Sequence, residues 1–443
     1  MPCGTKLKRW KSSQALNGPK QATHHLNRTS YVWMLANLNF LFVFFFSIHL
    51  SFAGGFPGHF GGIKSSGMAG TNSYDNGDAS ILFSNPALLV GISRSIVLGT
   101  SLQSPQTTFV EEGTRKTFDM LNQKVYTPVF AASYRSLKDS SWAIGVGLNS
   151  PFNLENRWEH GWLGRFVSTD FGIKTLRFHL GGSYLLKQKF AIGAGFNYST
   201  VKFDYRVALP YYDQDNIGSS LKFETTAQTI GFNAGLVVLV KQKAAVGIAF
   251  RSNTRFEFNE QDFELTVPSV LVDSFPAESF NSTFEFPWTV DLTFSYSAKK
   301  DVDVGAALEF HAWGSVDELI IDFSENSNYQ EDISVLGKFQ HAATARLGVE
   351  YNPEKKYQLR GGISYRLSPV KSGSLFPQLP DADNLGLSIG CTAELSKQFH
   401  LDFSLVYLEY ARRKESRNQN KEQLGGTYKS KSVIPGIALT WRY

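Results

Sequence analysis

The feature that most limits how this chain can fold is a long series of segments in which apolar and polar residues alternate. Alternation with a period of two places the apolar side chains on one face of a β-strand. From Ser95 onward we predict fourteen such strands, near residues 95–104, 125–136, 141–149, 174–187, 189–207, 221–240, 243–257, 283–298, 301–319, 338–352, 356–368, 384–396, 399–410 and 431–443.

The connections between these strands alternate between short and long. Short polar turns lie near 137–139, 187–189, 241–243, 299–301, 353–355 and 396–398, and long loops near 105–124, 150–173, 208–220, 258–282, 320–337, 369–383 and 411–430. Outer-membrane barrels have this asymmetry, whereas a soluble β-sandwich has no reason to keep it throughout. We therefore predict an all-β fold, a transmembrane antiparallel β-barrel of fourteen strands over residues 95–443.

The two faces of single strands fit a barrel with lipid outside. Within 346–351, Leu347, Val349 and Tyr351 oppose polar or small residues. Within 190–207 we place one apolar face on Ile192, Ala194, Phe196, Tyr198, Val201, Phe203 and Tyr205, with a slip near Thr200. By the same parity, the basic residues expected to face the lumen are Arg177, Lys202, Arg206, Arg251, Arg346, Arg360 and Arg366. The alternative is a soluble β-protein whose apolar faces form a core.

The first 53 residues read as a signal peptide with an extended basic segment. An apolar stretch from Phe40 to Leu50 precedes Ser51-Phe52-Ala53, which has small residues where a signal peptidase cuts. The alternative is a permanent anchor helix, but Asn37, Asn39 and His49 interrupt the apolar run. Removing residues 1–53 leaves 38 basic against 39 acidic residues, which argues against nucleic acid as a partner.

Cysteine content and hydropathy exclude other classes. Cys3 would be lost with the signal peptide, and Cys391 alone cannot form an intrachain disulfide or a cysteine metal cluster. The mean hydropathy of −0.19 does not suit a helical membrane protein. We predict no metal and no cofactor.

The segment between the signal peptide and the first strand is rich in Gly, Ser, Asn and Asp, without a regular apolar period. An irregular segment ahead of many amphipathic strands suggests a plug, or hatch, inside the barrel, over residues 54–94. Its marked positions are Ser65, Ser66, Gly67, Gly70, Asn85, Pro86 and Ala87. We expect Asn85-Pro86-Ala87 to form a structural turn, because Asn bonds nearby backbone and Pro fixes φ.

Several sequence blocks resemble one known family. SSGMAGT (65–71), GDAS (77–80) and NPALL (85–89) resemble the plug of the FadL-type long-chain fatty acid and hydrocarbon transporters. PFNL (151–154) resembles the end of their third strand, although Asn153 stands where the family more often has Gly. RLGVEY, LRGGISYRLSPV and LPDADNLGLSIG, within residues 346–390, form the most specific run. The resemblance spans residues 54–443.

This resemblance implies a monomeric barrel in the bacterial outer membrane that passively imports hydrophobic molecules. In the family, ligands are thought to leave sideways through a gap at a kink in the third strand. The ligands it implies are fatty acids or hydrocarbons. The expected surroundings are outer-membrane lipid and, for the charge run at 412–421, lipopolysaccharide. It also implies that the new N-terminus, with Phe56, reaches the ligand pocket.

The candidate wall opening is Gly147, Asn149, Ser150 and Pro151. Pro cannot donate to a β-ladder, so it marks an edge, a bulge or a strand end; a strand that simply stops is an equal alternative. The next loop carries apolar residues that could form a ligand groove: Phe152, Leu154, Trp158, Trp162, Leu163 and Phe166. Packing of the loop on itself, or an aromatic girdle, is the alternative.

Other residues bear on the ligand and on competing functions. A fatty acid carboxylate would need a cation, for which Arg251 and Arg346 are candidates. The last strand, ending at Trp441 and Tyr443, resembles the signal read by the barrel assembly machinery. The competing functions are a non-transporting structural or adhesive barrel and an outer-membrane hydrolase. We predict no enzyme, because the sequence has no HExxH or phosphate-binding motif.

Overall fold

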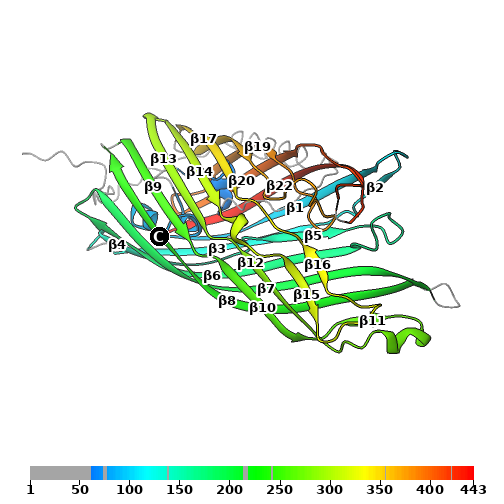
Figure 1. The fold of residues 1–443 in the computed structure, drawn as a ribbon. Helices are drawn as coiled ribbons and strands as arrows, with labels where there is room; N and C mark the ends of the chain where they lie inside the picture. Colours follow the sequence, from blue (N-terminus) through cyan, green and yellow to red (C-terminus); the bar gives the residue numbers. More distant parts are fainter. Residues whose placement is uncertain are drawn as a thin grey trace, which may run out of the picture. The chain divides into compact units, whose positions relative to one another are not determined.

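The computed structural model describes residues 61–72, 77–136, 139–212, 218–240, 243–354, 356–420 and 422–443. The predicted signal peptide and Phe56 lie outside these ranges. Within them, fourteen strands form an antiparallel ring in which each pairs with its two neighbours and the last pairs with the first (Figure 1). They are β1 (Ser95–Glu111), β3 (Val125–Arg135), β4 (Trp142–Asn149), β6 (Asp170–Leu186), β7 (Phe190–Tyr212), β8 (Gly218–Val240), β9 (Ala244–Arg251), β13 (Thr289–Lys299), β14 (Val302–His311), β17 (Ala342–Glu354), β18 (Tyr357–Arg366), β19 (Asn384–Glu394), β20 (Phe399–Tyr410) and β22 (Gly426–Arg442).

The predicted barrel is therefore confirmed, but several strands are longer than expected. β7 and β8 each have 23 residues, about twice the roughly 9–11 residues that cross a membrane. They extend into the region predicted as the loop 208–220, β7 as far as Tyr212 and β8 from Gly218, and β1 and β22 likewise extend into loops predicted at 105–124 and 411–430. Those loop boundaries were wrong, because the wall continues beyond the membrane at the end with the long connections. β2 (Thr117–Asp119) and β21 (Arg413–Glu415) pair with these extensions.

A second, smaller sheet extends the barrel at the same end. It consists of β10 (Thr254–Gln261), β12 (Phe280–Phe286), β15 (Leu319–Phe323) and β16 (Ile333–Leu336). Two predicted strands, 243–257 and 283–298, in fact span a barrel strand and a strand of this sheet. Pro287, which cannot donate to a ladder, follows β12 and separates it from β13. β11 (Glu264–Thr266), η4 (Ser269–Ser274) and η5 (Trp313–Ser315) complete these connections.

The apolar face of β7 changes sides half-way along the strand. Phe196 and Tyr198 point outward and are exposed, whereas Val201 and Phe203 are buried inside. The pairing of β7 with β6 keeps one register through this point, so the slip predicted near Thr200 is wrong. The reason is a change of surroundings. On the side of Thr200 toward the short turns, the outer face of the wall meets an apolar medium. On the side toward the long connections, the outer face meets water and the interior of the barrel is apolar.

This reversal also corrects two residues predicted to face the lumen. Lys202 and Arg206 share the outward parity of β7 above Thr200, and Lys202 forms an ion pair with Glu224 of β8 on that outer face. Arg206 donates to Ser220 at 3.4 Å. Odd and even positions of a strand identify its two faces, but the prediction of which face is the lumen failed here because the apolar side of β7 changes near Thr200.

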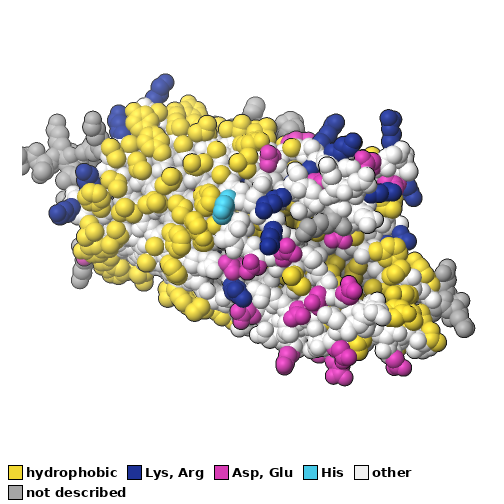
Figure 2. Space-filling model, in the orientation of Figure 1, with side chains coloured by type: hydrophobic (Ala, Val, Ile, Leu, Met, Phe, Trp, Pro, Cys, Tyr) yellow, Lys and Arg dark blue, Asp and Glu magenta, His cyan; other side chains and the backbone are white. Residues whose placement is uncertain are grey.

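Exposed apolar side chains form a belt around the half of the barrel with the short turns, and charged residues gather over the other half (Figure 2). The belt includes Leu98, Ile144, Phe178, Leu180, Ile230, Phe232, Leu292, Leu347, Val349, Tyr351, Ile363, Leu387, Ile389, Leu439 and Trp441. Such a surface suits the hydrocarbon core of a membrane. Among the described residues, no helix is long and apolar enough to cross one.

Among the described residues before β1, three short helical segments lie against the inner wall of the ring. They are α2 (Ile63–Ser66), η1 (Ala79–Phe83) and η2 (Pro86–Gly91). α2 contacts β19 and β20, η1 contacts β3 and β4, and η2 contacts β6, β7 and β8. Leu82 and Leu89 pack against inward alanines of the wall, Ala143 and Ala191. The described parts of the segment expected to form the hatch therefore lie inside the barrel.

Candidate functional site in the barrel wall

The hydrogen-bonded wall is interrupted beside the end of β4. β4 pairs with β6 up to Asn149↔Arg177, and the chain then pairs with β6 again as β5 (Asn153–Arg157), beginning at Asn153↔Lys174. The chain uses one residue more than β6 between these two pairs, which is the signature of a bulge. On the other side, β3 pairs with β4 only as far as Val129↔Asn149 in the described ladders. Above that level, β3 and β5 lie side by side without a ladder among the described residues.

A side chain bridges this gap. The amide of Asn153 donates from Nδ2 to Oγ1 of Thr127 on β3 at 3.3 Å. Its Oδ1 accepts from the backbone N–H of Thr175 on β6 at 3.1 Å. The hydroxyl of Thr175 in turn donates to the carbonyl of Phe152 at 2.7 Å. The bulge is thus held from β6, and one amide of the described residues links it to β3.

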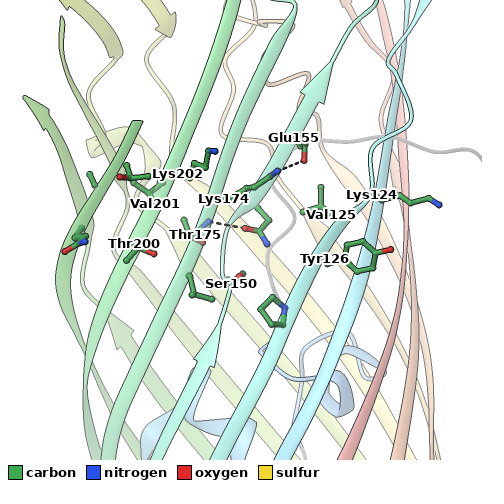
Figure 3. Close-up of a pocket in the computed structure, with 16 residues that line it drawn as sticks. Lys124, Val125, Tyr126, Ser150, Glu155, Lys174, Thr175, Thr200, Val201 and Lys202 are labelled. Carbon is green, nitrogen blue, oxygen red and sulfur yellow. Dashed lines mark hydrogen bonds and ion pairs between the residues drawn. The ribbon is translucent and has the colours of Figure 1, made fainter. Parts of the chain in front are cut away.

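A pocket of about 480 Å³ opens on the outer face at this gap. Figure 3 shows its two sides, with Lys124 and the first residues of β3, Val125 and Tyr126, on one side and residues of β6 and β7 opposite them. Lys174 lies at its upper side and forms an ion pair with Glu155 at 2.9 Å. The pocket lies where outward residues change from apolar Leu176 to charged Lys174, at the edge of the belt.

An aromatic cluster lies on the inner side of the wall above the gap. Five of the six residues predicted for a ligand groove belong to it or pack on it: Phe152, Leu154, Trp158, Trp162 and Leu163. Phe152 stacks on Phe286 with centroids 3.8 Å apart, and Trp158 stacks on Trp162 at 4.3 Å. Leu154 is also buried in the cluster. It further contains Phe109, Phe171, Phe203, Tyr205, Phe223, Phe256, Phe258, Phe280, Phe284, Trp313 and Tyr428.

The last two residues of the predicted groove differ from each other. Leu163 is partly buried and packs against the cluster, but Phe166 is 42% exposed. Its ring lies under the guanidinium of Arg165, 4.3 Å from the centroid. Phe166 therefore belongs to the outer surface of the turn that follows β5 and not to the cluster.

The loop at 369–383 covers the cluster from the end with the long connections. Its central residues, 375–382, are buried. Nε1 of Trp158 donates to the carbonyl of Pro377 at 3.2 Å, and Asn156 donates to that of Gln378 at 2.5 Å. Asn420 donates to the carbonyl of Leu375 at 3.0 Å. These bonds hold the loop in the mouth of the barrel.

The candidate opening residues lie where the hatch meets the wall. A Cβ on Gly147 would stand 2.5 Å from the ring of Phe83 in η1, so the glycine allows this close approach. Oδ1 of Asn149 accepts from Nε2 of His179 at 2.9 Å, and Ser150 is buried at the pocket. Pro151 follows β4 and is partly exposed. The hatch and the gap thus share a border.

The hatch residues singled out in the sequence make mostly local contacts. Ser65 and Ser66 both donate to the carbonyl of Gly62, at 2.9 and 2.8 Å. Gly70 has a φ of 82°, which glycine adopts without strain. A Cβ on Gly67 would lie 2.9 Å from the backbone of Gly390.

The turn Asn85-Pro86-Ala87 combines a local cap with a bond to the wall. The side chain of Asn85 accepts from the backbone N–H of Ala87 at 3.0 Å, with Pro86 at the start of η2. Its Nδ2 also donates to the carbonyl of Ile248 in β9 at 3.3 Å. This second bond ties the hatch to the barrel.

The two basic residues proposed to meet a ligand carboxylate are both paired with acidic side chains. Nη2 of Arg251 lies 3.1 Å from Glu309. Arg346 also contacts Glu309 and lies 3.7 Å from Asp291. Sequence parity placed both in the lumen correctly but could not show these pairs, which join β9, β13, β14 and β17. Arg177, in contrast, donates to hydroxyl groups only among the described partners.

Other features of the site were not singled out from the sequence. Thr127, Thr175 and Phe286 are ordinary residues of strands, and their roles depend on which strand lies opposite. A weak signal did exist at Asn153, since an amide at a strand break can bond backbone groups. Among the described residues, no group of histidine, cysteine or acidic side chains could hold a metal ion.

Comparison with known proteins identifies the family. The family model described as outer membrane protein transport protein (OMPP1/FadL/TodX) matches residues 52–443. The chain belongs to this family. Family membership and the apolar belt place it in the bacterial outer membrane.

Individual relatives of the family are distant in sequence. The chain is 21% identical over 297 residues to the long-chain fatty acid transport protein of Escherichia coli, which covers 60% of this chain and 65% of that protein. It thus spans less than two thirds of the length of this relative and of others like it. A FadL homologue from Pseudomonas aeruginosa has the same fold, with a TM-score of 0.73 at 16% identity over 89% of this chain and 100% of that one. The toluene transporter TodX of Pseudomonas putida gives 0.67 at 16% identity, over 86% and 98%.

Proposed function

We propose that this protein imports hydrophobic compounds across the outer membrane and releases them sideways, through the gap between β3 and β5. The observation that carries the proposal is the interrupted ladder above Asn149, with a pocket of about 480 Å³ against it on the outer face. The E. coli relative is a long-chain fatty acid transport protein and the P. putida one a toluene transporter. Both names describe the carriage of hydrophobic molecules.

The route follows from where apolar and polar surfaces lie. The aromatic cluster offers an apolar environment on the inner side of the wall, above the hatch. Below it, the lumen is filled by α2, η1 and η2 and lined by charged pairs such as Arg360–Glu350. An apolar molecule moving along the barrel axis past the hatch would lose its apolar surroundings. This loss costs about 25 cal/mol of free energy for each Å² of apolar surface exposed to water. Moving sideways through the gap, it would pass directly into hydrocarbon.

Closure of the gap would depend on Asn153. The bond from Asn153 to Thr127 crosses the gap by side chains rather than by a backbone ladder, and a side-chain hydrogen bond contributes only about 1 kcal/mol net. A link of this strength can open and close thermally. The hatch residue Phe83 packs against Gly147, close to the gap. Movement of the hatch would therefore change the packing at the gap.

The expected surroundings complete the proposal. We propose a monomer, because the ring of strands closes on itself through β1 and β22. Ile437, Leu439, Trp441 and Tyr443 share the exposed face of the last strand, which suits recognition by the barrel assembly machinery. Exposed charged residues beyond the apolar belt, such as Lys202 and Glu224, support lipopolysaccharide as a further partner.

A reversible lock tests the lateral route. In a Cys391→Ser background, Thr127→Cys with Asn153→Cys places one thiol on each side of the gap, and oxidation to a disulfide locks the gap. We expect uptake of labelled oleate and toluene by whole cells to fall to the rate of cells that lack the protein. Treatment with a reductant should restore it.

The matched control joins two strands where the ladder is intact. Thr107 and Ser430 lie opposite each other on β1 and β22, with their hydroxyl oxygens 3.0 Å apart. Thr107→Cys with Ser430→Cys should cross-link without changing uptake. A gap lock that forms fully and leaves uptake intact would refute the lateral route. If the wild-type protein gave no faster uptake than cells that lack it, a structural or adhesive barrel would be favoured instead.

A further inference from the structure

A second large cavity lies in the wall at the end with the long connections. It has a volume of about 640 Å³ and is formed where the turn after β5 meets the ends of β7 and β8. Its described lining includes two arginines, Arg165 and Arg206, and no acidic residue. The transport route proposed above does not use this cavity.

The backbone segments that carry the two arginines are joined by hydrogen bonds. The N–H of Ala208 donates to the carbonyl of Arg165 at 3.0 Å. The N–H of Thr169 donates to the carbonyl of Arg206 at 2.8 Å. The turn after β5 is therefore held along β7, and this arrangement brings two partly buried guanidinium groups to one cavity.

Neither arginine forms an ion pair with any residue that the structure describes. Arg165 donates from Nη1 to the carbonyl of Trp162 at 3.3 Å. Arg206 donates from Nη2 to Oγ of Ser220 at 3.4 Å. The acidic residue opposite Arg206 in the ladder, Asp170, is instead paired with an arginine of β5 at 3.6 Å. Each guanidinium carries five N–H groups, so most of them remain available to an anion.

A buried hydroxyl at the same cavity also lacks a partner. Ser219 is 3% exposed, and its Oγ makes no hydrogen bond within the described parts of the chain. Buried polar atoms without a partner are rare in folded proteins, because they lose their bonds to water and gain nothing in return. An anion in the cavity would supply the missing acceptor.

This set of donors fits a phosphate ester. Arginine binds a phosphate through two parallel N–H bonds, which a single lysine cannot provide. A phosphate also has oxygens left to accept from a hydroxyl such as that of Ser219. The cavity is larger than a phosphate group needs and lies in the usual size range of ligand pockets, so an attached sugar also has room.

The position of the cavity indicates where such a phosphate would come from. On β7, Lys202 is the first charged outward residue beyond the apolar belt, and Arg206 follows it by four residues. Four residues of a strand span about 13 Å. The outer leaflet of the bacterial outer membrane consists of lipopolysaccharide, whose phosphorylated sugars lie just outside the hydrocarbon. The cavity is therefore at the level of those sugars.

We propose that this cavity binds a phosphate group of a lipopolysaccharide molecule beside the barrel, with Arg165 and Arg206 as the cationic ligands and Ser219 as a hydrogen-bond donor. The inference rests on the proposed contact with lipopolysaccharide and gives that contact a specific site. It does not depend on the route by which hydrophobic compounds cross the wall.

The test compares lipopolysaccharide with and without its phosphate groups. The purified protein in detergent is titrated with fluorescently labelled lipopolysaccharide, either intact or dephosphorylated with hydrofluoric acid. We expect Arg165→Gln with Arg206→Gln to weaken binding of the intact form by roughly ten- to a hundredfold, the range for loss of charged hydrogen bonds. The dephosphorylated form should bind the wild type as weakly as the intact form binds this variant.

The matched control removes two positive charges elsewhere at the same end of the barrel. Lys338 and Lys371 are exposed and flank the bridge between Phe339 and Val370. Lys338→Gln with Lys371→Gln should change binding by less than about twofold, because exposed charges are screened by salt.

Ser219→Ala separates a role in binding from a role in folding. We expect it to weaken binding of intact lipopolysaccharide by about two- to fivefold, through loss of one hydrogen bond. The thermal stability of the ligand-free barrel should stay unchanged, because the hydroxyl has no described partner to lose. A loss of stability without a loss of binding would contradict the assigned role.

Several outcomes would overturn the proposal. Equal weakening by the two double variants would show a general attraction to positive charge, and tight binding of the dephosphorylated form would exclude phosphate as the bound group. Inorganic phosphate that competes as strongly as lipopolysaccharide would mean a site for the free anion. If the double arginine variant does not fold, Arg206→Gln alone and Ser219→Ala decide. Uptake of oleate is measured separately, so failure of this site and failure of transport are distinguishable.

Discussion

Gly193 has no side chain because the hatch lies directly against it. A Cβ placed there would stand 2.4 Å from the backbone nitrogen of Ala87, and backbone cannot move aside as a flexible side chain can. The contact joins η2 to β7, so the glycine is part of how the hatch is held. Period-two alternation marks Gly193 as inward, but only the fold shows what it touches.

We expect Gly193→Ala to loosen the hatch and to lower the stability of the folded barrel by roughly 1–3 kcal/mol, the usual cost of overpacking. Urea unfolding in lipid vesicles and the protease sensitivity of the hatch would measure it. The control is Gly161→Ala, where nothing lies within 4 Å of the new methyl group. Equal effects of the two substitutions would contradict the contact.

Arg360 shows how much a buried charge depends on its partners. Its side chain is fully buried, and it donates to Glu350 at 2.6 Å, Gln358 at 2.7 Å and Thr392 at 2.8 Å. Removing one member of such a pair leaves the other charge buried. Arg360→Ala should cost about 3–5 kcal/mol, measured by the same urea unfolding.

The comparison for Arg360 is an exposed ion pair on the second sheet. Arg255 lies 3.2 Å from Glu257, and both side chains are more than half exposed. Arg255→Ala should change stability by less than about 1 kcal/mol. A similar loss in both variants would show that burial is not what makes the Arg360 pair important.

At the scale of an element, β7 shows how one strand serves two surroundings. Outward residues are apolar up to Tyr198 and charged from Lys202, while inward residues change from glycine and Asn197 to Val201 and Phe203. The register with β6 is continuous, so the strand itself is regular. The change marks the level at which the wall leaves the hydrocarbon.

Cysteine labelling can test this reversal. In a Cys391→Ser background, we expect Lys202→Cys to react with a membrane-impermeant maleimide on intact cells, because Lys202 lies on the outer, aqueous face. Phe203→Cys should stay protected inside the aromatic cluster. If β7 instead slipped near Thr200, residue 203 would face outward and residue 202 the lumen, and the labelling pattern would be reversed.

On the scale of the whole molecule, the medium decides which exposed apolar residues are tolerated and which are required. Leu180, at the middle of the belt on β6, and Ile320, on the second sheet, are both exposed aliphatic residues. The first meets lipid and the second meets water. The same substitution should therefore have different consequences at the two sites.

We expect Leu180→Arg to cost about 2–4 kcal/mol, the penalty for an arginine near the middle of the bilayer, and to lower the amount of folded protein in outer-membrane fractions. Ile320→Arg should leave that amount unchanged. Heat-modifiable mobility on gels distinguishes folded from unfolded barrel. Equal tolerance at both sites would contradict the position assigned to the belt.

The sequence by itself determined the fourteen strands and the outward face of the belt, because alternation and turn residues are local properties that do not depend on distant partners. It also placed Arg251 and Arg346 in the lumen. Only the tertiary structure decided that these two are paired with Glu309 while Arg177 has hydroxyl partners, since ion pairs depend on which strands meet. The reversal of faces in β7 and the gap beside Asn149 were likewise decided only by the tertiary structure. Each depends on what lies outside or opposite a strand, and alternation along one strand carries no information about either.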